Sequence, residues 1–494
     1  MAIDGEDDQR AKPFLPPGND EEGKSSRGLM TRVWEEEKKL WVVAGPAIFT
    51  RFSTFGVSII SQAFMGHIGS TELAAYALVF TVVVRFANGI LLGMASALET
   101  LCGQSFGAGQ NHMLGIYLQR SWLVLLPFTA ALLPLFLFTT PVLRLLGQDE
   151  SVALMAGKIS VWFIPAVFSY SLSFTLQMYL QAQSKNRVIT YYAALSLSVH
   201  VLLSWFLTAK LGMGVAGVMG STIIALWIPV VGQLVFVVCG GCPETWNGLS
   251  CEAFKDLWGV VKLSFSSGIM LCLELWYNTI LILLTGHMDD AEISIDALSI
   301  CLNINGWEMM IALGFLAAIG VRVANELGAG NADKAKFSIL ICVATSSAIG
   351  FTLFLIFLFL PGRISYIFST SSLVAGAVAN LSPLLAFSIL LNSVQPVLSG
   401  VAIGAGWQST VAYVNIACYY LVGIPLGVVL AYVIGLGVKG VWLGMILGIA
   451  VQTLVLTYIT CRTDWDHQVF AARSRLKRWL VSKPDKEDPA NEEA

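Results

Sequence analysis

Long apolar stretches recur about twelve times along the 494 residues, and they restrict the possible fold more than any other feature. A helix needs about 20 apolar residues to cross a bilayer, because each residue advances it by about 1.5 Å. Only 12% of the residues are charged, whereas soluble domains carry about 25%. The sequence therefore predicts an all-α polytopic membrane protein, with spans at 40–66, 72–98, 115–140, 156–181, 188–209, 213–239, 260–286, 295–324, 337–360, 378–403, 410–434 and 438–461.

An internal repeat divides these spans into two sets of six. Gly107-Ala-Gly-Gln recurs as Gly328-Ala-Gly-Asn, 221 residues later, and Gln183-Ser recurs as Gln408-Ser, 225 residues later. An even number of spans in each copy gives both copies the same orientation in the membrane. We therefore expect two pseudo-symmetric six-helix lobes at 39–240 and 260–462, a cytosolic connector at 241–259, a disordered cytosolic tail at 1–38 and a second cytosolic tail at 463–494.

Glu274 stands in the middle of the apolar stretch 263–288. A carboxylate at the centre of a bilayer costs about 2.5–3.5 kcal/mol, so we expect its side chain to face a cavity or a partner. Protonation removes most of this cost, which makes Glu274 a candidate proton-coupling residue. The alternative is an interior glutamate whose hydrogen bonds only fix helix packing.

Two more acids, Asp296 and Glu308, lie in the eighth span. They are twelve residues apart, which is about 18 Å along a helix, so they cannot serve one compact site together. Glu274 and Glu308 lie in the middle of consecutive spans and are expected at a similar depth. Two carboxylates in a low dielectric favour protonation of at least one of them. We assign proton coupling primarily to Glu274, with Glu308 or Asp296 as an accessory.

Arg51 and Arg85 are fixed positive charges inside the first two spans. Each needs a counter-ion, which is either Glu99, a backbone carbonyl or an anionic substrate. A structural ion pair and an anion-attracting cavity in the N-terminal lobe both remain open.

Other polar and aromatic side chains in the spans are candidates to line a substrate cavity, together with these two arginines. Interior Asn and Gln often only form interhelical hydrogen bonds, worth about 0.6 kcal/mol, and aromatic side chains often only pack. Prolines inside spans free a backbone carbonyl and permit a kink. The cavity candidates are Gln177, Trp276, Tyr277, Asn278, Asn303, Asn392 and Gln395, and the hinge candidates are Pro46, Pro165 and Pro396.

Seven motifs together point to a known family: MGHIG, LLGMASALETLCGQSFGAGQ, LQAQSKN, MLCLELWYN, SICLNING, RVANELGAGN and SGVAIGAGWQ. With them, the chain resembles plant multidrug and toxic compound extrusion (MATE) transporters over roughly residues 35–465, especially the detoxification branch that includes vacuolar flavonoid carriers. The resemblance implies a twelve-helix MATE fold of two lobes around a V-shaped cleft. It also implies exchange of protons for organic substrates by alternating access, with the coupling acid of the LCLE motif at Glu274.

Two positions depart from the family pattern. Many relatives carry an acid before LSICL, where this chain has Ser294, with Asp296 two residues on. The resemblance therefore does not assign the second coupling acid. Some bacterial relatives use an Asp in the first helix, where GPAIFTRFSTFG has none and carries Arg51. This difference leaves room for an anionic substrate.

The sequence thus predicts a proton-coupled antiporter that exports organic solutes, such as flavonoid, phenolic or other xenobiotic-like metabolites, from the cytosol. We expect a monomer in the vacuolar or plasma membrane, with both termini cytosolic and no cofactor, bound metal or nucleic-acid partner. The alternative, motivated by Arg51 and Arg85, is a passive channel or carrier for chloride or organic acids. The chain has no GxxxxGK[ST] or HExxH motif, so we expect neither an enzyme nor a primary pump.

Overall fold

The computed structural model describes residues 28–145, 147–285, 291–360 and 372–479, and every regular element in them is a helix. The elements labelled η are π-helical, except η4, which is a 3-10 turn. In chain order they are α1 (Leu29–Ile68), α2 (Ser70–Leu78), η1 (Val79–Val84), α3 (Arg85–Gly107), α4 (Asn111–Leu137), α5 (Thr139–Leu145), α6 (Glu150–Ala182), α7 (Asn186–Ser204), η2 (Trp205–Lys210), α8 (Gly214–Phe236), η3 (Val237–Gly241), η4 (Cys251–Phe254), α9 (Leu257–Thr285), α10 (Ala291–Ala329), α11 (Ala332–Phe359), α12 (Ser372–Asn392), α13 (Gln395–Ala405), α14 (Gln408–Asn415), η6 (Ile416–Gly423), α15 (Ile424–Val428), η7 (Val429–Val433), α16 (Val438–Arg462) and α17 (Trp465–Trp479).

Within the described residues, 12 helical segments are long and apolar enough to cross a membrane. The all-α polytopic fold is therefore confirmed, and the predicted spans match these segments apart from a few residues at their ends. The main difference is α1, which begins at Leu29 and not near residue 40.

A buried ion cluster explains why α1 begins so early. Arg322 of α10 donates from Nε to Glu36 Oε1 at 2.9 Å and from Nη2 to Glu36 Oε2 at 3.2 Å. Arg322 Nη2 also donates to Glu326 Oε1 at 2.8 Å, and Ser338 Oγ of α11 donates to Glu36 Oε1 at 2.5 Å. This forked geometry is the stronger kind of charged hydrogen bond. It holds the polar first turns of α1 against α10 and α11.

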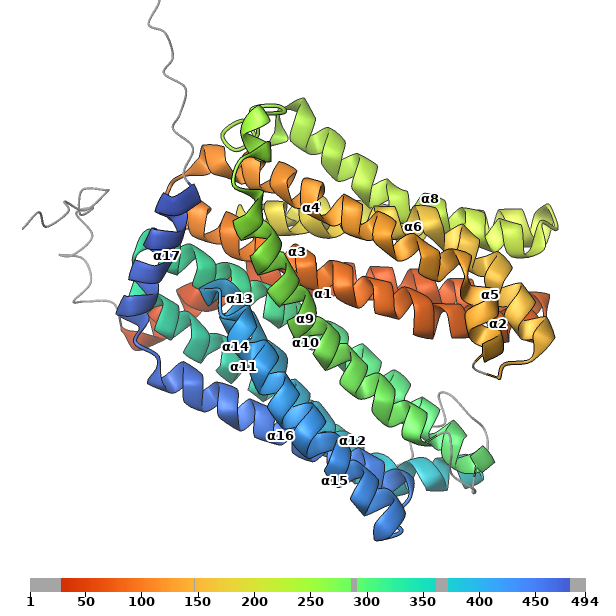
Figure 1. Ribbon diagram of the computed structural model, residues 1–494. Helices are drawn as coiled ribbons and strands as arrows, with labels where there is room; N and C mark the ends of the chain where they lie inside the picture. The colour runs from red at the N-terminus through yellow and green to blue at the C-terminus, as the bar shows by residue number, and fades with distance from the viewer. Residues whose placement is uncertain (1–27, 146, 286–290, 361–371, 480–494) are drawn as a thin grey trace, which may run out of the picture.

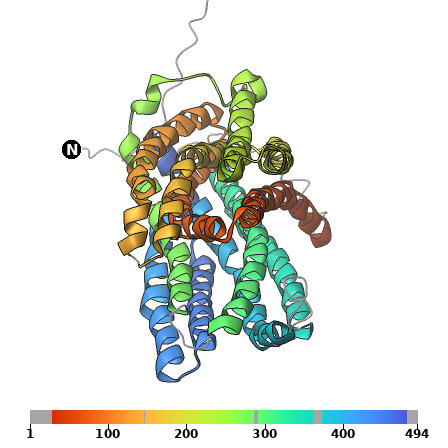
Figure 2. The ribbon, with the colours of Figure 1, turned by 90° about the vertical axis from the view of Figure 1, so that its right-hand side faces the viewer.

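The helices form two groups that lie together at one end of the molecule and diverge toward the other end (Figure 1). The first group contains α1–α8 and the second contains α9–α16, and Figure 2 shows the first group above the second. One buried core extends from Met65 to Val260, and another extends from Tyr277 to Ile449. The exact bounds of the two lobes, 39–240 and 260–462, stay a prediction.

The two groups meet where α3 crosses α10. A Cβ added to Gly107 of α3 would overlap the backbone carbonyl of Asn325. In the reverse direction, a Cβ added to Gly328 of α10 would overlap the carbonyl of Gln104. These two contacts are related by the same 221-residue offset as the repeated Gly-Ala-Gly motif. Glycine has no Cβ, so it allows two helix backbones to approach this closely.

A separate helix, α17, covers the end where the groups meet (Figure 1). It lies within 463–494, which we predicted only as a tail. The rings of Trp465 and Trp407 are 5.4 Å apart, and Trp407 Nε1 donates to Gln468 Oε1 at 2.9 Å. Arg475 Nη1 donates to Gln104 Oε1 of α3 at 2.7 Å. Thus α17 contacts the second group through Trp407 and the first group through Gln104.

We expect Gly107→Ala and Gly328→Ala to destabilise the protein, because overpacking a tight contact commonly costs about 1–3 kcal/mol. Gly220→Ala in α8 is the control, since a Cβ there meets nothing within 4 Å. In a helix interior, Ala is also more favourable than Gly by roughly 1 kcal/mol. Thermal unfolding of the purified proteins in detergent measures the difference. Equal melting temperatures for Gly107→Ala and Gly220→Ala would contradict the tight crossing.

Candidate functional site

One membrane-spanning segment of the second group is broken in its middle. Helix α12 ends at Asn392, and α13 begins at Gln395 and continues with Pro396. Proline has no backbone N–H to donate to the preceding turn. The carbonyl of Ser393, between the two helices, accepts a hydrogen bond from Ser346 Oγ of α11 at 2.6 Å. The hinge candidate Pro396 therefore lies at a real interruption of the helix.

Glu274 of α9 reaches this interruption. Gln395, the first residue of α13, donates from Nε2 to Glu274 Oε1 at 3.0 Å. The same Nε2 lies 3.1 Å from Ser399 Oγ, one turn further along α13. The structure thus brings together two residues that the sequence suggested separately, one as an acid and one as a cavity residue.

Glu308 of α10 lies next to the residue on the other side of the break. Its side chain is buried, and Asn392 lies beside its carboxyl group. Asn392 Nδ2 also donates to Asn305 Oδ1 at 3.1 Å. Among the described residues, Glu308 Oε2 has no hydrogen-bond partner. The two acids therefore each lie beside one of the two residues that border the break.

A stacked tyrosine pair lies near Glu274 and was not predicted as a unit. The rings of Tyr277 and Tyr419 are 4.2 Å apart, and Tyr277 OH donates to the carbonyl of Gly444 at 3.0 Å. Tyr419 OH donates to Gln452 Oε1 at 2.5 Å and interacts electrostatically with Glu274. Tyr419 belongs to the π-helical turn η6, and such turns are frequent at functional sites. The signal for Tyr419 and Gln452 was their polarity inside the last two spans.

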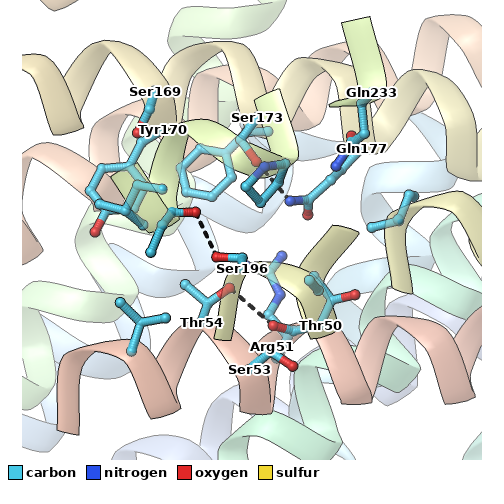
Figure 3. Close-up of a pocket in the computed structure, with 17 residues that line it drawn as sticks. Thr50, Arg51, Ser53, Thr54, Ser169, Tyr170, Ser173, Gln177, Ser196 and Gln233 are labelled. Atoms are coloured by element: carbon cyan, nitrogen blue, oxygen red, sulfur yellow. Dashed lines mark hydrogen bonds between the residues drawn. The ribbon is translucent and has the colours of Figure 1, made fainter. Parts of the chain in front are cut away.

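In the first group, Arg51 of α1 borders two cavities. The smaller one, of about 50 Å³, is lined largely by polar side chains of α1, α6, α7 and α8. The larger one, of about 190 Å³, is lined mainly by aromatic and aliphatic side chains. Figure 3 shows Arg51 extending from α1 into the smaller cavity, toward the α6 side chain of Gln177. Gln177 Nε2 donates to Ser173 Oγ at 2.9 Å. The candidates Arg51 and Gln177 therefore line one cavity.

Three other cavity candidates lie elsewhere. Arg85 is exposed at the start of α3 and lines neither of these cavities. Trp276 stacks on Phe86 of α3, with ring centroids 5.1 Å apart. Asn303 of α10 is exposed. Their roles toward a substrate stay predictions.

The remaining candidates are two polar residues and two prolines. The side chains of Asn278 and Asp296 lie outside the described residues. Pro46 and Pro165 lie inside the continuous helices α1 and α6, so neither marks a break like the one before Pro396. In the part of the chain that the structure describes, no group of three or more His, Cys, Asp or Glu side chains is placed to hold a metal ion.

The sequence matches the family model MatE over residues 46–206 and 267–429, more than half of the chain. The chain belongs to the MATE family of efflux transporters. This MATE transporter is 65% identical to Protein DETOXIFICATION 21 of Arabidopsis thaliana over 463 residues, which cover 94% of both chains. It is 51% identical to Protein DETOXIFICATION 27 of the same plant over 477 residues, covering 96% of this chain and 98% of the other.

Solved structures show the same fold. The crystal structure of the eukaryotic MATE transporter AtDTX14 aligns with a TM-score of 0.85 at 32% identity, covering 90% of this chain and 99% of that one. The Vibrio cholerae MATE transporter VcmN in its bent form aligns with a TM-score of 0.75 at 14% identity, covering 90% and 99%. The family, the MATE fold and the assignment as a transporter and not an enzyme are therefore confirmed.

We expect Gln395→Leu to slow solute transport by about 10- to 100-fold, because a hydrogen bond to a charged group contributes about 1.5–3 kcal/mol. Ser399→Ala is the matched control, since it removes the other partner of Gln395 and leaves the bond to Glu274 in place. Uptake of phenolic compounds by proteoliposomes measures the rates, and thermal unfolding confirms folding. If both variants transport at the wild-type rate, the contact with Glu274 has no role in transport.

Proposed function

We propose that this MATE transporter is a proton-coupled antiporter that exports organic solutes from the cytosol by alternating access. The observation that supports it best is the hydrogen bond from Gln395 Nε2 to Glu274 Oε1, at 3.0 Å. It joins an acid inside the membrane to the first residue after a helix break, directly before Pro396. A change in the charge of Glu274 therefore acts directly on the break between α12 and α13.

Proton binding changes what Gln395 can donate to. The ionised carboxylate of Glu274 only accepts hydrogen bonds, whereas the protonated carboxyl is neutral and carries a donor of its own. Hydrogen bonds to charged groups are about twice as strong as those between neutral groups. Protonation therefore weakens the link between α9 and α13 and favours a different arrangement at the break. Glu308, beside Asn392, is the accessory acid that we assign to the same step, while Asp296 stays a second candidate.

The proton gradient supplies enough free energy for such a change. Each proton that crosses 100 mV contributes about 2.3 kcal/mol, and each pH unit contributes about 1.4 kcal/mol. A ligand or proton shifts a two-state transporter only as far as it binds one state better than the other. One proton can therefore change the ratio of the two access states by more than tenfold.

We assign both ends of the chain to the cytosol. At the end where the groups meet, the short connectors and the first turns of the helices that follow them carry Lys185, Arg187, Lys334 and Lys336. Positive charges in and next to short connectors favour the cytosolic side. Flavonoid, phenolic or other xenobiotic-like metabolites are the proposed substrates. The vacuolar and the plasma membrane are the proposed locations, with the protein acting as a monomer.

We expect Glu274→Gln to abolish pH-driven transport and to leave expression and folding intact, because the amide resembles a protonated carboxyl that cannot ionise. Glu150→Gln is the control, since Glu150 lies exposed at the start of α6 and pairs with Arg144. A screen of phenolic compounds in proteoliposomes, with and without a pH gradient, compares the three proteins. Normal proton-driven uptake by Glu274→Gln would refute this assignment.

A passive anion channel or carrier is the second candidate. It is favoured by Arg51, which forms no hydrogen bond or ion pair within the described part of the chain. Recordings from planar bilayers decide between the two functions. Anion current without a proton gradient, reduced in Arg51→Gln, would support the channel, and absence of current would leave the antiporter.

A further inference from the structure

Arg51 is a cation inside the first group with no direct neutralising partner in the described residues. It forms no hydrogen bond or ion pair there. Glu99 acts on it electrostatically but is packed against Gly320 of α10, where a Cβ would overlap Glu99 Oε1. Charged side chains within the membrane are costly unless they meet a partner or a water-filled cavity. Arg51 borders two cavities, and its positive charge favours an anion as a ligand there.

Gln233 of α8 is a second, independent unpaired group at the smaller cavity. Its side chain is 0% exposed, and neither Nε2 nor Oε1 has a hydrogen-bond partner among the described residues. An unpaired buried polar group costs about 1–3 kcal/mol. The nearby hydroxyl groups of Thr50 and Ser196 already donate to backbone carbonyls. The N–H groups of Arg51 and Gln233, and the second N–H of Gln177, are available to a ligand.

The larger cavity has the volume and the lining for an aromatic ring. Its volume is about 190 Å³, and a cavity of about 150 Å³ is enough to bind benzene. The rings of Tyr76 and Phe163 are 6.0 Å apart, and those of Tyr170 and Phe174 are 5.9 Å apart. Aromatic rings attract one another in stacked and edge-on geometries at such distances. The lining includes six aromatic side chains, Phe55, Tyr76, Phe80, Phe163, Tyr170 and Phe174.

The two cavities are neighbours. They share lining residues that include Arg51, Thr54 and Tyr170. The smaller cavity, at about 50 Å³, holds only a few waters or a group of the size of a carboxylate. A ligand with its ring in the larger cavity would therefore reach Arg51 with an acidic group attached to that ring.

We propose that these joined cavities bind an aromatic carboxylate, with the ring among the six aromatic side chains and the carboxylate on Arg51, Gln177 and Gln233. As an assignment of substrate class, this rests on the proposed export function, but the binding site itself is testable without transport. A cation is disfavoured because it would face Arg51. An uncharged aromatic compound leaves Arg51 and Gln233 without partners.

Equilibrium binding to the purified transporter tests the site with three probes. Cinnamate carries a ring and a carboxylate, cinnamamide carries the same ring without charge, and hexanoate carries the carboxylate without a ring. We expect cinnamate to bind at least 10-fold more tightly than either of the other two by isothermal titration calorimetry. Equal affinities for cinnamate and cinnamamide would overturn the proposal. Binding of chloride without any binding of cinnamate would also overturn it.

Variants separate a binding role of Arg51 from a structural one. Arg51→Gln should remove the preference for cinnamate over cinnamamide and should melt, without ligand, at the wild-type temperature or above, because it removes an unpartnered charge. Gln233→Leu should weaken cinnamate binding by several-fold. Arg187→Gln is the control, since Arg187 lies exposed in α7. A lower melting temperature of Arg51→Gln with unchanged cinnamate affinity would make Arg51 structural and overturn the site.

The same measurements keep this site apart from proton coupling. We expect Glu274→Gln to bind cinnamate like the wild type. Cinnamate binding in a protein that shows no proton-driven transport would refute the antiporter and support the site. Proton-driven transport of other solutes without cinnamate binding would refute the site and support the antiporter.

Discussion

The close crossing of α3 and α10 determines how the two groups of helices are held together. Because Gly107 and Gly328 each lie against the backbone of the opposite helix, no side chain separates the groups at this end. Further along α3, Gly93 lies against Gly268 of α9, where a Cβ would also be too close. Helix α3 of the first group therefore contacts both helices that carry the buried acids of the second group.

The two groups differ in the ionisable side chains that border their irregular or hollow regions. The second group places Glu274 and Glu308 beside a broken helix, and the first group places Arg51 between two cavities. Charge inside a membrane is tolerated where irregular backbone or a cavity supplies polar partners. In the function proposed here, the second group responds to protons and the first group holds an anionic solute. A solute and a proton would then bind at separate places and influence each other only through the shared helix contacts.

Much of this arrangement was predictable because twelve spans leave a strong apolar signal, and an acid such as Glu274 is conspicuous within one. The contact between Glu274 and Gln395 was not predictable, because it depends on the rotation of two helices that are far apart in sequence. The repeat at Gly107 was visible, but nothing in it showed that the two copies touch. Helix α17 was missed because it lies in a charged segment that gives no membrane signal. Arg85 resembled Arg51 in sequence, yet the structure places it outside both cavities.

The position of α17 bears on where the slow step of a transport cycle lies. Its Arg475 donates a hydrogen bond to Gln104, within the same turns of α3 that cross α10, while the ring of Trp465 packs against that of Trp407 of the second group. If this end of the molecule is to admit a solute, the hydrogen bond at Arg475 or the ring contact at Trp407 must first be lost. The activation barrier for that movement then includes the contacts of α17, a helix that is not one of the 12 membrane-spanning segments.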